Sequence, residues 1–382
     1  MLRIERDRPD RIFGDRKLVV VVPVENGIPM SAVTMKRSDL EALENDAAVE
    51  MLARTSISDA YGRRTPEDLV TFPRFSWEVA PYFDYSGFDP DMPLRIDVGA
   101  RAAASYEIRR NLVLSGEIRK RVIGNLDEIS RESESLLPRV RTDYRLYAKE
   151  GDPFIRYLTL DHYGRPAPDL YSRVSVGYLE RMYAGVSGEV LWKPADSRLA
   201  FGAELNYVRR RAFDGMFGLE ENVTVDPVSG IEREIPDVNG HVSGYYAFGN
   251  GFHGQVDVGR YLAGDYGATF TLTRDFANGW SVGAFATFTD VTEEEFGEGS
   301  FDKGIRFSMP VNWILGQPSR QTVGTTITPI TRDGGQRLVL DAPAHRRTHR
   351  PIAGHLVSRQ TIPFLVLNPM ARGVRRAPAL RR

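Results

Sequence analysis

The chain has 382 residues, enough for more than one domain, and its 50 Lys and Arg nearly balance 51 Asp and Glu. A net charge of −1 offers no electrostatic basis for binding nucleic acid, which is therefore not an expected partner. The sequence contains no Cys, which excludes disulfides, thiolate metal sites, Cys nucleophiles and a lipid anchor on an N-terminal Cys within it. Its 16 Tyr, 19 Phe and 35 Gly favour a β-rich protein with many turns.

Residues 1–66 differ in pattern from the rest of the chain. Lys17 to Val24 reads KLVVVVPV, which is typical of a buried strand, and Pro29 to Met35 forms a returning strand. Ser38 with Glu41 three residues later has the spacing of a capping box, and predicts a helix. We expect a small α/β segment over 1–66, the end of a domain truncated upstream, followed by a polar linker. The charged start MLRIERDRPDR is not a secretory signal.

Beyond the linker, apolar residues recur with a period of two, as in strands with one apolar face. Short polar turns separate these runs, and no helical pattern interrupts them, so the predicted sheet is antiparallel. The alternation predicts about fourteen strands, with an uncertainty of about two. They cover residues 75–83, 94–100, 112–118, 140–149, 154–161, 171–179, 182–192, 199–208, 241–248, 253–262, 266–273, 280–289, 304–313 and 321–330.

The clearest pair of strands lies between Gly259 and Ser308. Two alternating runs flank Asn278-Gly279, and Asn-Gly is a strong signal for a hairpin with a type I′ turn. An open sheet of this size would expose two edges, and closure into a barrel removes them. The prediction is a mainly β chain: an antiparallel outer-membrane-type β-barrel of about 12–14 strands over 67–341, preceded by the small α/β segment. A large soluble β-sandwich is the competing architecture.

Charged residues near two turns are the candidate contacts for a polysaccharide or for the barrel lumen. Glu298 precedes Asp302, Lys303 and Arg306 in an acidic loop, and Arg332-Asp333 precedes Gly334-Gly335. For the acidic loop we prefer the simpler explanation of a solvated hairpin loop, and for Arg332 to Gly335 that of a plain turn. The cluster Arg119-Lys120-Arg121 fits either lipid headgroups or a strand end in solvent.

Residues at strand ends and the six His give no enzyme signal. The aromatic residues near strand ends fit an interface girdle or ordinary β-propensity: Trp77, Tyr82, Phe83, Trp192, Tyr207, Trp280 and Trp313. No His has the spacing of a metal site, and no Ser/His/Asp set stands out. We therefore expect no catalytic residues, no metal and no cofactor.

The last stretch, residues 342–382, has nine Arg, three His and no acidic residue, and the alternation stops there. Our hypothesis is that this basic tail is not native to the fold, for example the product of a frameshift. A basic solvent-exposed tail is the alternative.

Three blocks of the sequence resemble the YjbH/GfcD family of exopolysaccharide and capsule biosynthesis proteins. They are VPVENGIPMSAVT at 22–34 with RSDLE at 37–41, the blocks LSG, RKRVIGN and LPRVRTD within 114–143, and VGRYL, FGEGSFDKG and TRDGG within 258–335. The resemblance covers roughly 17–341, with the blocks in the family's order.

The resemblance implies a non-enzymatic outer-membrane β-barrel with a periplasmic N-terminal segment. It implies a part in biosynthesis, secretion or assembly of an extracellular polysaccharide. The implied partners are the exopolysaccharide, outer-membrane lipid and other components of a polysaccharide secretion system. Family members carry a signal peptide and usually a lipoprotein Cys, neither of which occurs in this sequence. Two alternatives stay open: a soluble all-β polysaccharide hydrolase or lyase, and an assembly protein that makes no pore.

Overall fold

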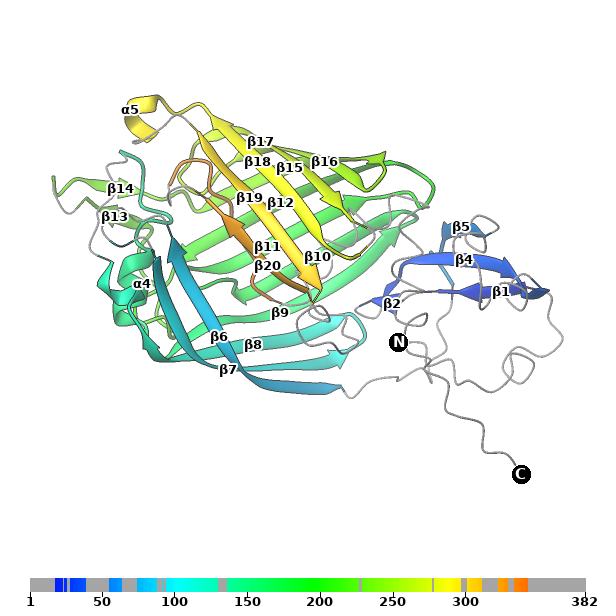
Figure 1. Ribbon diagram of the computed structural model, residues 1–382, viewed down its shortest axis with the longest axis horizontal. Helices are drawn as coiled ribbons and strands as arrows, with labels where there is room; N and C mark the ends of the chain where they lie inside the picture. Colours follow the sequence, from blue (N-terminus) through cyan, green and yellow to red (C-terminus); the bar gives the residue numbers. More distant parts are fainter. Residues whose placement is uncertain are drawn as a thin grey trace.

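The computed structural model describes residues 18–22, 24–25, 28–38, 55–63, 74–87, 92, 94–129, 136–226, 229–276, 278–296, 301–310, 322–328 and 333–342. Thirteen strands form one antiparallel sheet that curls into a nearly closed barrel (Figure 1). They are β6 (Phe75–Gly87), β7 (Leu94–Arg109), β8 (Leu112–Gly124), β9 (Phe154–Ala167), β10 (Leu170–Tyr178), β11 (Tyr183–Trp192), β12 (Leu199–Arg210), β15 (Val238–Gly249), β16 (Phe252–Arg260), β17 (Tyr266–Asp275), β18 (Ser281–Thr289), β19 (Asp302–Pro310) and β20 (Thr322–Ile327).

The remaining elements are small. A three-stranded sheet near the N-terminus has the order β1 (Leu18–Val21), β4 (Ser31–Lys36), β5 (Ser56–Asp59), and β2 (Val24–Glu25) pairs with β3 (Ile28–Pro29). Between the barrel strands lie η1 (Leu126–Glu128), α4 (Tyr144–Glu150), the hairpin β13 (Val223–Val225) and β14 (Glu232–Glu234), and α5 (Glu293–Phe296). Within the described residues, no helix has the length and apolar character that crossing a membrane requires.

The barrel has an inverted polarity, with apolar side chains outside and polar side chains inside. On β12, Leu205 is 64% exposed whereas its neighbour Asn206 is 1% exposed. On β17, Phe270 and Leu272 are about half exposed whereas Thr269 and Thr271 are buried. Because successive residues of a strand point to opposite faces, this alternation gives every wall strand an apolar outer face. The period of two in the sequence is therefore confirmed, and the apolar face is the outer one.

The two ends of the barrel differ in their connections. Connections of two residues, at 110–111, 168–169 and 250–251, lie at one end, which we call the short-turn end. Their tight turns use positive φ at Asn111, Asp169 and Asn250, and at Gly251, where a Cβ would lie 2.2 Å from the Asp275 carbonyl oxygen. The connections that carry α4, β13–β14 and α5 lie at the opposite, long-loop end (Figure 1).

The barrel has a seam between its first and last strands. Because the number of strands is odd and all neighbours are antiparallel, β6 and β20 run in the same direction. Among the described residues no main-chain pairing joins them. The Tyr85 hydroxyl of β6 and the Thr325 hydroxyl of β20 are in contact across the seam.

The small N-terminal sheet sits at the short-turn end (Figure 1). Arg165 of β9 donates hydrogen bonds to the carbonyl oxygens of Pro29 (2.7 Å) and Met30 (3.1 Å), and pairs with the Asp59 carboxylate. The Arg165 guanidinium also stacks over the Tyr171 ring at 4.6 Å. Asp59 accepts a further bond from the backbone N–H of Asp169, so the sheet is fixed to the β9–β10 turn.

The structure corrects the predicted strand at 140–149, because Tyr144–Glu150 forms α4 instead. Tyr144, Tyr147 and Ala148 fall at i, i+3 and i+4 and turn one helix face inward, whereas a strand would separate them. The other predicted barrel strands are present, with β6, β7, β8 and β9 longer than expected, and the last residues of the predicted strands 304–313 and 321–330 lie outside the described residues. The hairpin β17–β18 is confirmed, with a connection that spans 276–280 and a positive φ at Gly279 of the Asn-Gly pair. The predicted helix after Ser38 and the tail after Ala342 lie outside the described residues.

The plugged barrel interior as a candidate functional site

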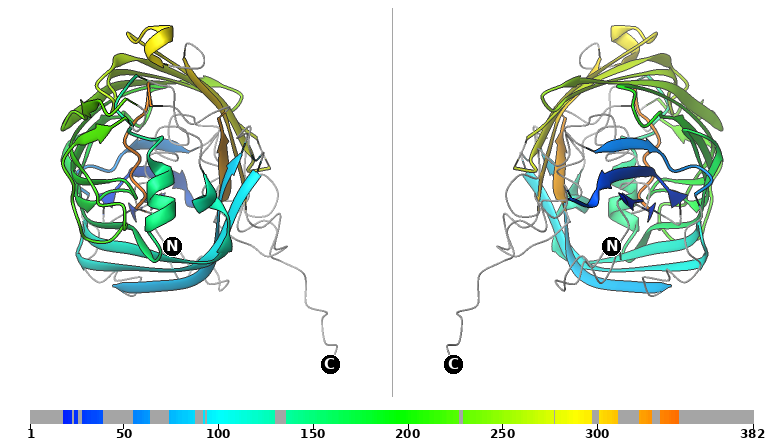
Figure 2. Two further views of the ribbon diagram at one scale, coloured as in Figure 1. Left: turned by 90° about the vertical axis from the view of Figure 1, so that its left-hand side faces the viewer. Right: turned by 90° about the vertical axis from the view of Figure 1, so that its right-hand side faces the viewer.

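The interior at the long-loop end is filled by a plug with its own apolar core. Tyr147 of α4 is fully buried, and α4 lies within the outline of the ring of strands when the barrel is viewed from its long-loop end (Figure 2). The core brings together residues far apart in the sequence: Val140, Tyr147, Leu179, Met182, Tyr183, Val208, Ile235, Leu262, Ala263, Leu338 and Leu340. Much of the remaining inner wall is polar, so this cluster is a local hydrophobic core inside a largely polar barrel.

Residues 333–342, which we call the strap, cross this plug without regular secondary structure. At its start, the Asp333 carboxylate accepts hydrogen bonds from the backbone N–H groups of Arg141 (2.8 Å) and Thr142 (3.0 Å) and from the Thr142 hydroxyl (2.7 Å). Complete burial raises the pKa of Asp333 to about 6, although these three hydrogen bonds favour the ionised form. The strap is thus anchored to the segment that leads into α4.

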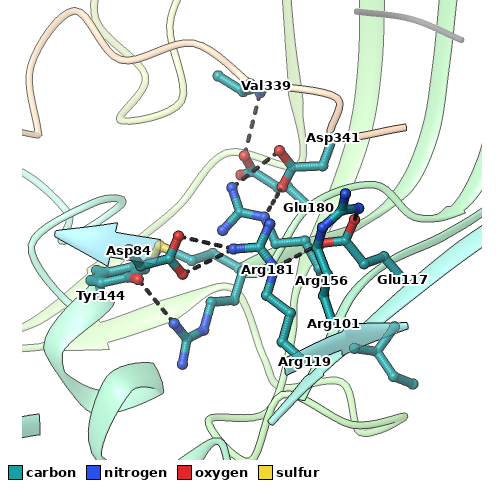
Figure 3. Close-up of polar contacts among 12 residues, drawn as sticks. Asp84, Arg101, Glu117, Arg119, Tyr144, Arg156, Glu180, Arg181, Val339 and Asp341 are labelled. Carbon is teal, nitrogen blue, oxygen red and sulfur yellow. Dashed lines mark hydrogen bonds and ion pairs between the residues drawn. The ribbon is translucent and has the colours of Figure 1, made fainter. Parts of the chain in front are cut away.

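Two ion pairs fix the middle and end of the strap to the barrel wall. Arg337 pairs with Asp257 of β16 at 2.8 Å. Asp341 pairs with Arg156 of β9, with 2.6 Å between the Asp341 Oδ2 and the Arg156 Nε. Figure 3 shows this second pair beside Glu180, which accepts a hydrogen bond from the backbone N–H of Val339. Since these partners come from separate strands and turns, the strap is held along its whole length.

A charge network covers the neighbouring wall of β6, β7 and β8 (Figure 3). Arg119 donates to both oxygens of Asp84, at 2.9 and 3.0 Å, and to Glu117 at 2.7 Å. Glu117 also pairs with Arg101 at 3.3 Å. These side chains are paired with one another, so the wall offers a dense set of hydrogen-bonding groups whose charges are balanced.

This surface is suited to binding hydroxyl groups, and its chemistry suggests no particular reaction. Carboxylates, guanidinium groups and Thr hydroxyls present both donors and acceptors, as sugar hydroxyls require. Over the part of the chain that the structure describes, no group of three or more His, Asp or Glu side chains is arranged to hold a metal ion.

Two of the six predicted contact residues meet at the strap. Asp333 belongs to it, and Asp302 accepts a hydrogen bond from Gln336 at 3.1 Å. Lys303 instead lies on the exposed side of β19 with its ammonium 4.4 Å from the centre of the Phe301 ring. Arg306 stacks over the Phe285 ring at 4.8 Å. Glu298 and Arg332 lie outside the described residues.

The run Arg119-Lys120-Arg121, for which lipid headgroups and a strand end in solvent were both open, does not form one surface cluster. Arg119 and Arg121 point inward, to Asp84 and Asp127, and only Lys120 lies on the exposed face. Alternation along β8 places Arg119 on the same face as Glu117, and this signal was available in the sequence. Of the predicted girdle aromatics, Tyr82 is buried in the interior, whereas Trp77 and Phe83 are exposed on the outer wall.

Comparison with known proteins gives a consistent assignment. Residues 12–350 match the family model described as "YjbH: Exopolysaccharide biosynthesis protein YbjH". The chain is 31% identical over 326 residues to an uncharacterized lipoprotein YjbH of Escherichia coli (strain K12), covering 82% of this chain and 45% of that protein. The chain thus spans less than half the length of this curated relative.

Among solved structures, similarity is found to OmpT, an outer membrane protein of Vibrio cholerae. The loop L8 deletion mutant gives a TM-score of 0.29 at 11% identity, covering 62% of this chain and 87% of that one. The in-vitro folded OmpT gives 0.27 at 11% identity, covering 61% and 79%. The match to the family model extends over most of the sequence, and the chain belongs to the YjbH family of exopolysaccharide biosynthesis proteins.

Proposed function

We propose that this chain forms a barrel in the outer membrane and acts, without catalysing a reaction, where an exopolysaccharide is secreted or assembled. The observation that carries the proposal is the inverted polarity of the wall. Leu205 and Val242 are more than 60% exposed, whereas Asn206 and His241 on the same strands are buried. In water such a surface would aggregate, whereas in a bilayer the apolar face contacts lipid and the barrel satisfies its backbone groups internally.

The connections support one orientation of the barrel. In outer-membrane barrels the periplasmic turns are short and the extracellular loops are longer. The short-turn end, with the β1–β4–β5 sheet docked on it through Arg165 and Asp59, would then face the periplasm. The plug and α5 would lie toward the cell surface.

The polar interior supports a role with a carbohydrate. Hydroxyl, carboxylate and guanidinium groups line it, and a sugar chain can exchange hydrogen bonds among such groups without tight selectivity. In this proposal the strap and α4 keep the interior closed, and transit of a polysaccharide requires them to move. The plug also favours a second candidate, in which the barrel is an assembly protein and no polymer passes through it.

The first test is folding of the chain into detergent micelles and lipid vesicles, followed by electrophoresis with and without heating. We expect heat-dependent migration together with β-rich circular dichroism. A chain that is soluble in plain buffer and shows no such shift would contradict a membrane location.

Conductance in planar bilayers separates the two candidate roles. Passage through the barrel is supported if the wild type does not conduct and a variant without the strap anchors, for instance Asp333→Ala with Asp341→Ala, does. Persistent lack of conductance in that variant favours the assembly role. Cleavage of purified exopolysaccharide by the folded protein would overturn the non-enzymatic part of the proposal.

A further inference from the structure

The outer wall has an apolar groove of about 500 Å³ near the short-turn end. Phe75 and Trp77 of β6 form one side, and Leu114 and Ile118 of β8 with Leu158 of β9 form the other. Small residues make its floor: Ala102 and Ala104 of β7 and Gly116 of β8. The lining surface is almost entirely apolar.

The floor is low because three neighbouring positions lack long side chains. Phe75 pairs with Tyr106 and Trp77 with Ala104 in the β6–β7 register, while Ala104 pairs with Gly116 in the β7–β8 register. Since Gly116 in turn pairs with Leu158 of β9, the low floor lies between Trp77 on one side and Leu158 on the other. At Gly116 a Cβ would lie 3.0 Å from the Leu158 Cδ1, so a side chain there would narrow the groove.

Three arginines stand at the end of the groove nearest the short turns. Arg74 directly precedes Phe75, and its carbonyl oxygen accepts a hydrogen bond from the Glu107 N–H at 2.7 Å. Arg109 ends β7, and Arg110 lies in the two-residue turn to β8. All three are exposed. An apolar groove thus opens toward a cluster of cationic groups at the level where the wall strands begin.

We propose that this groove binds one anionic glycerophospholipid, with an acyl chain between Trp77 and Leu158 and the phosphate against Arg109 and Arg110. This inference rests on the proposed membrane location. A lipid matches the surface because its apolar and anionic parts lie in the same order along the membrane normal as the groove and the arginines. Phe75, Trp77 and Tyr106 occupy the depth at which aromatic side chains gather near headgroups.

Native mass spectrometry of the detergent-folded protein tests the site with two probes, dioleoyl phosphatidylglycerol and dioleoyl phosphatidylcholine. We expect one phosphatidylglycerol to be retained in preference to phosphatidylcholine. Arg109→Gln with Arg110→Gln should reduce this preference by roughly fivefold per arginine. Arg198→Gln, which changes an exposed arginine in another connection at the same end, is the matched control and should leave the preference unchanged.

Filling the groove tests the acyl-chain part. Ala104→Leu should reduce retention of both lipids, whereas Ala284→Leu, at an exposed alanine on the outer face of β18, should not. A second measurement requires no substitution that fills the groove. In vesicles, brominated phosphatidylglycerol should quench the fluorescence of Trp77 more strongly than brominated phosphatidylcholine does. The Trp77 signal is the difference between the wild type and Trp77→Phe.

Equal retention of the two lipids, or equal effects of each variant and its control, would overturn the lipid site. This failure is distinguishable from failure of the membrane proposal, because heat-modifiable migration is measured on the same samples. A protein that folds into vesicles but shows no lipid preference loses only the lipid site.

Discussion

Arg156 on β9 and Asp341 in the strap form a two-point ion pair that joins the barrel wall to the plug. The distances are 2.6 Å from Nε to Oδ2 and 3.1 Å from Nη2 to Oδ1. The Asp341 side chain is 2% exposed, and its backbone N–H also donates to the Leu179 carbonyl oxygen. Removing one member of such a pair leaves the other charge poorly compensated, which makes it a sensitive point for opening the strap.

The first prediction concerns Asp341→Asn. Loss of the carboxylate charge should weaken the strap by about 2–3 kcal/mol, a roughly 30- to 160-fold increase in local opening. The chain has no Cys, so Leu340→Cys, at a position 1% exposed, gives a single thiol that reacts with a maleimide only when the strap opens. Val339→Cys, at a position 55% exposed, is the reactive control. Unchanged labelling at position 340 would show that the ion pair does not hold the strap.

The second prediction concerns pH. The pKa of Asp333 is about 6 in the folded protein, above its ordinary 3.8, so the protonated form is favoured by folding. Its contribution to stability is complete below about pH 3.8 and is lost as the pH rises through 6, by roughly 3 kcal/mol at most. Opening of the strap should therefore increase from pH 4 to pH 7. The measurement is maleimide labelling of Leu340→Cys at each pH, divided by labelling of Val339→Cys at the same pH. Adding Asp333→Asn should remove the increase in labelling between pH 4 and pH 7. If the pH profile is the same with and without Asp333→Asn, Asp333 is not the group that causes the increase.

The third prediction separates a lipid-facing wall from a soluble sheet. Leu205→Arg places a charge at the middle of the outer face of β12, where a bilayer should make folding about 2–4 kcal/mol less favourable. Ile231→Arg, at an exposed position between β13 and β14, should have little effect. Folding yields in lipid vesicles, read by heat-modifiable migration, measure both. Equal yields would mean that β12 does not face lipid.

The fourth prediction concerns the docked N-terminal sheet. Arg165→Ala removes the hydrogen bonds to Pro29 and Met30 and leaves Asp59 without its guanidinium partner, which should loosen the sheet by about 3 kcal/mol. Hydrogen exchange in β4 should rise, while exchange in β11 and β12 stays constant. Arg198→Ala is the control for loss of an arginine at the same end. A rise throughout the barrel would instead indicate that Arg165 stabilises the whole fold.

Much of the barrel was predictable because its determinants are local. Alternation determines which residues of a strand share a face: Thr269 and Thr271 lie on the inner face and Phe270 lies on the outer one. Short polar turns make consecutive strands antiparallel neighbours. The sequence alone does not predict the helix α4, because its seven residues, YRLYAKE, are too few to distinguish a helical period from a period of two. Only its packing inside the barrel, around the buried Tyr147, selects the helix.

The interior site was less accessible to sequence reasoning. Asp302 and Asp333 could be named as charged residues near turns, but their meeting at the strap depends on pairings between distant strands. The bond from Arg141 to Asp333 joins residues 192 apart in the sequence. No local pattern records such a contact, and Arg156 and Asp341 carry no motif. Arg119 and Glu117 are two residues apart on β8 and therefore lie on the same face, so Arg119 points inward because Glu117 does.

The position of the strap in the sequence has a consequence for the order of folding. Its partners, such as Arg141, Arg156 and Asp257, belong to loops and strands synthesised well before residues 333–342. Contacts between residues far apart in the chain form late, because the intervening segments must first be arranged. We therefore expect the wall to assemble around an interior that is still unfilled and the strap to close it afterwards. Assembly of the wall and locking of its interior would then be separate steps, and a variant that fails in the second should still complete the first.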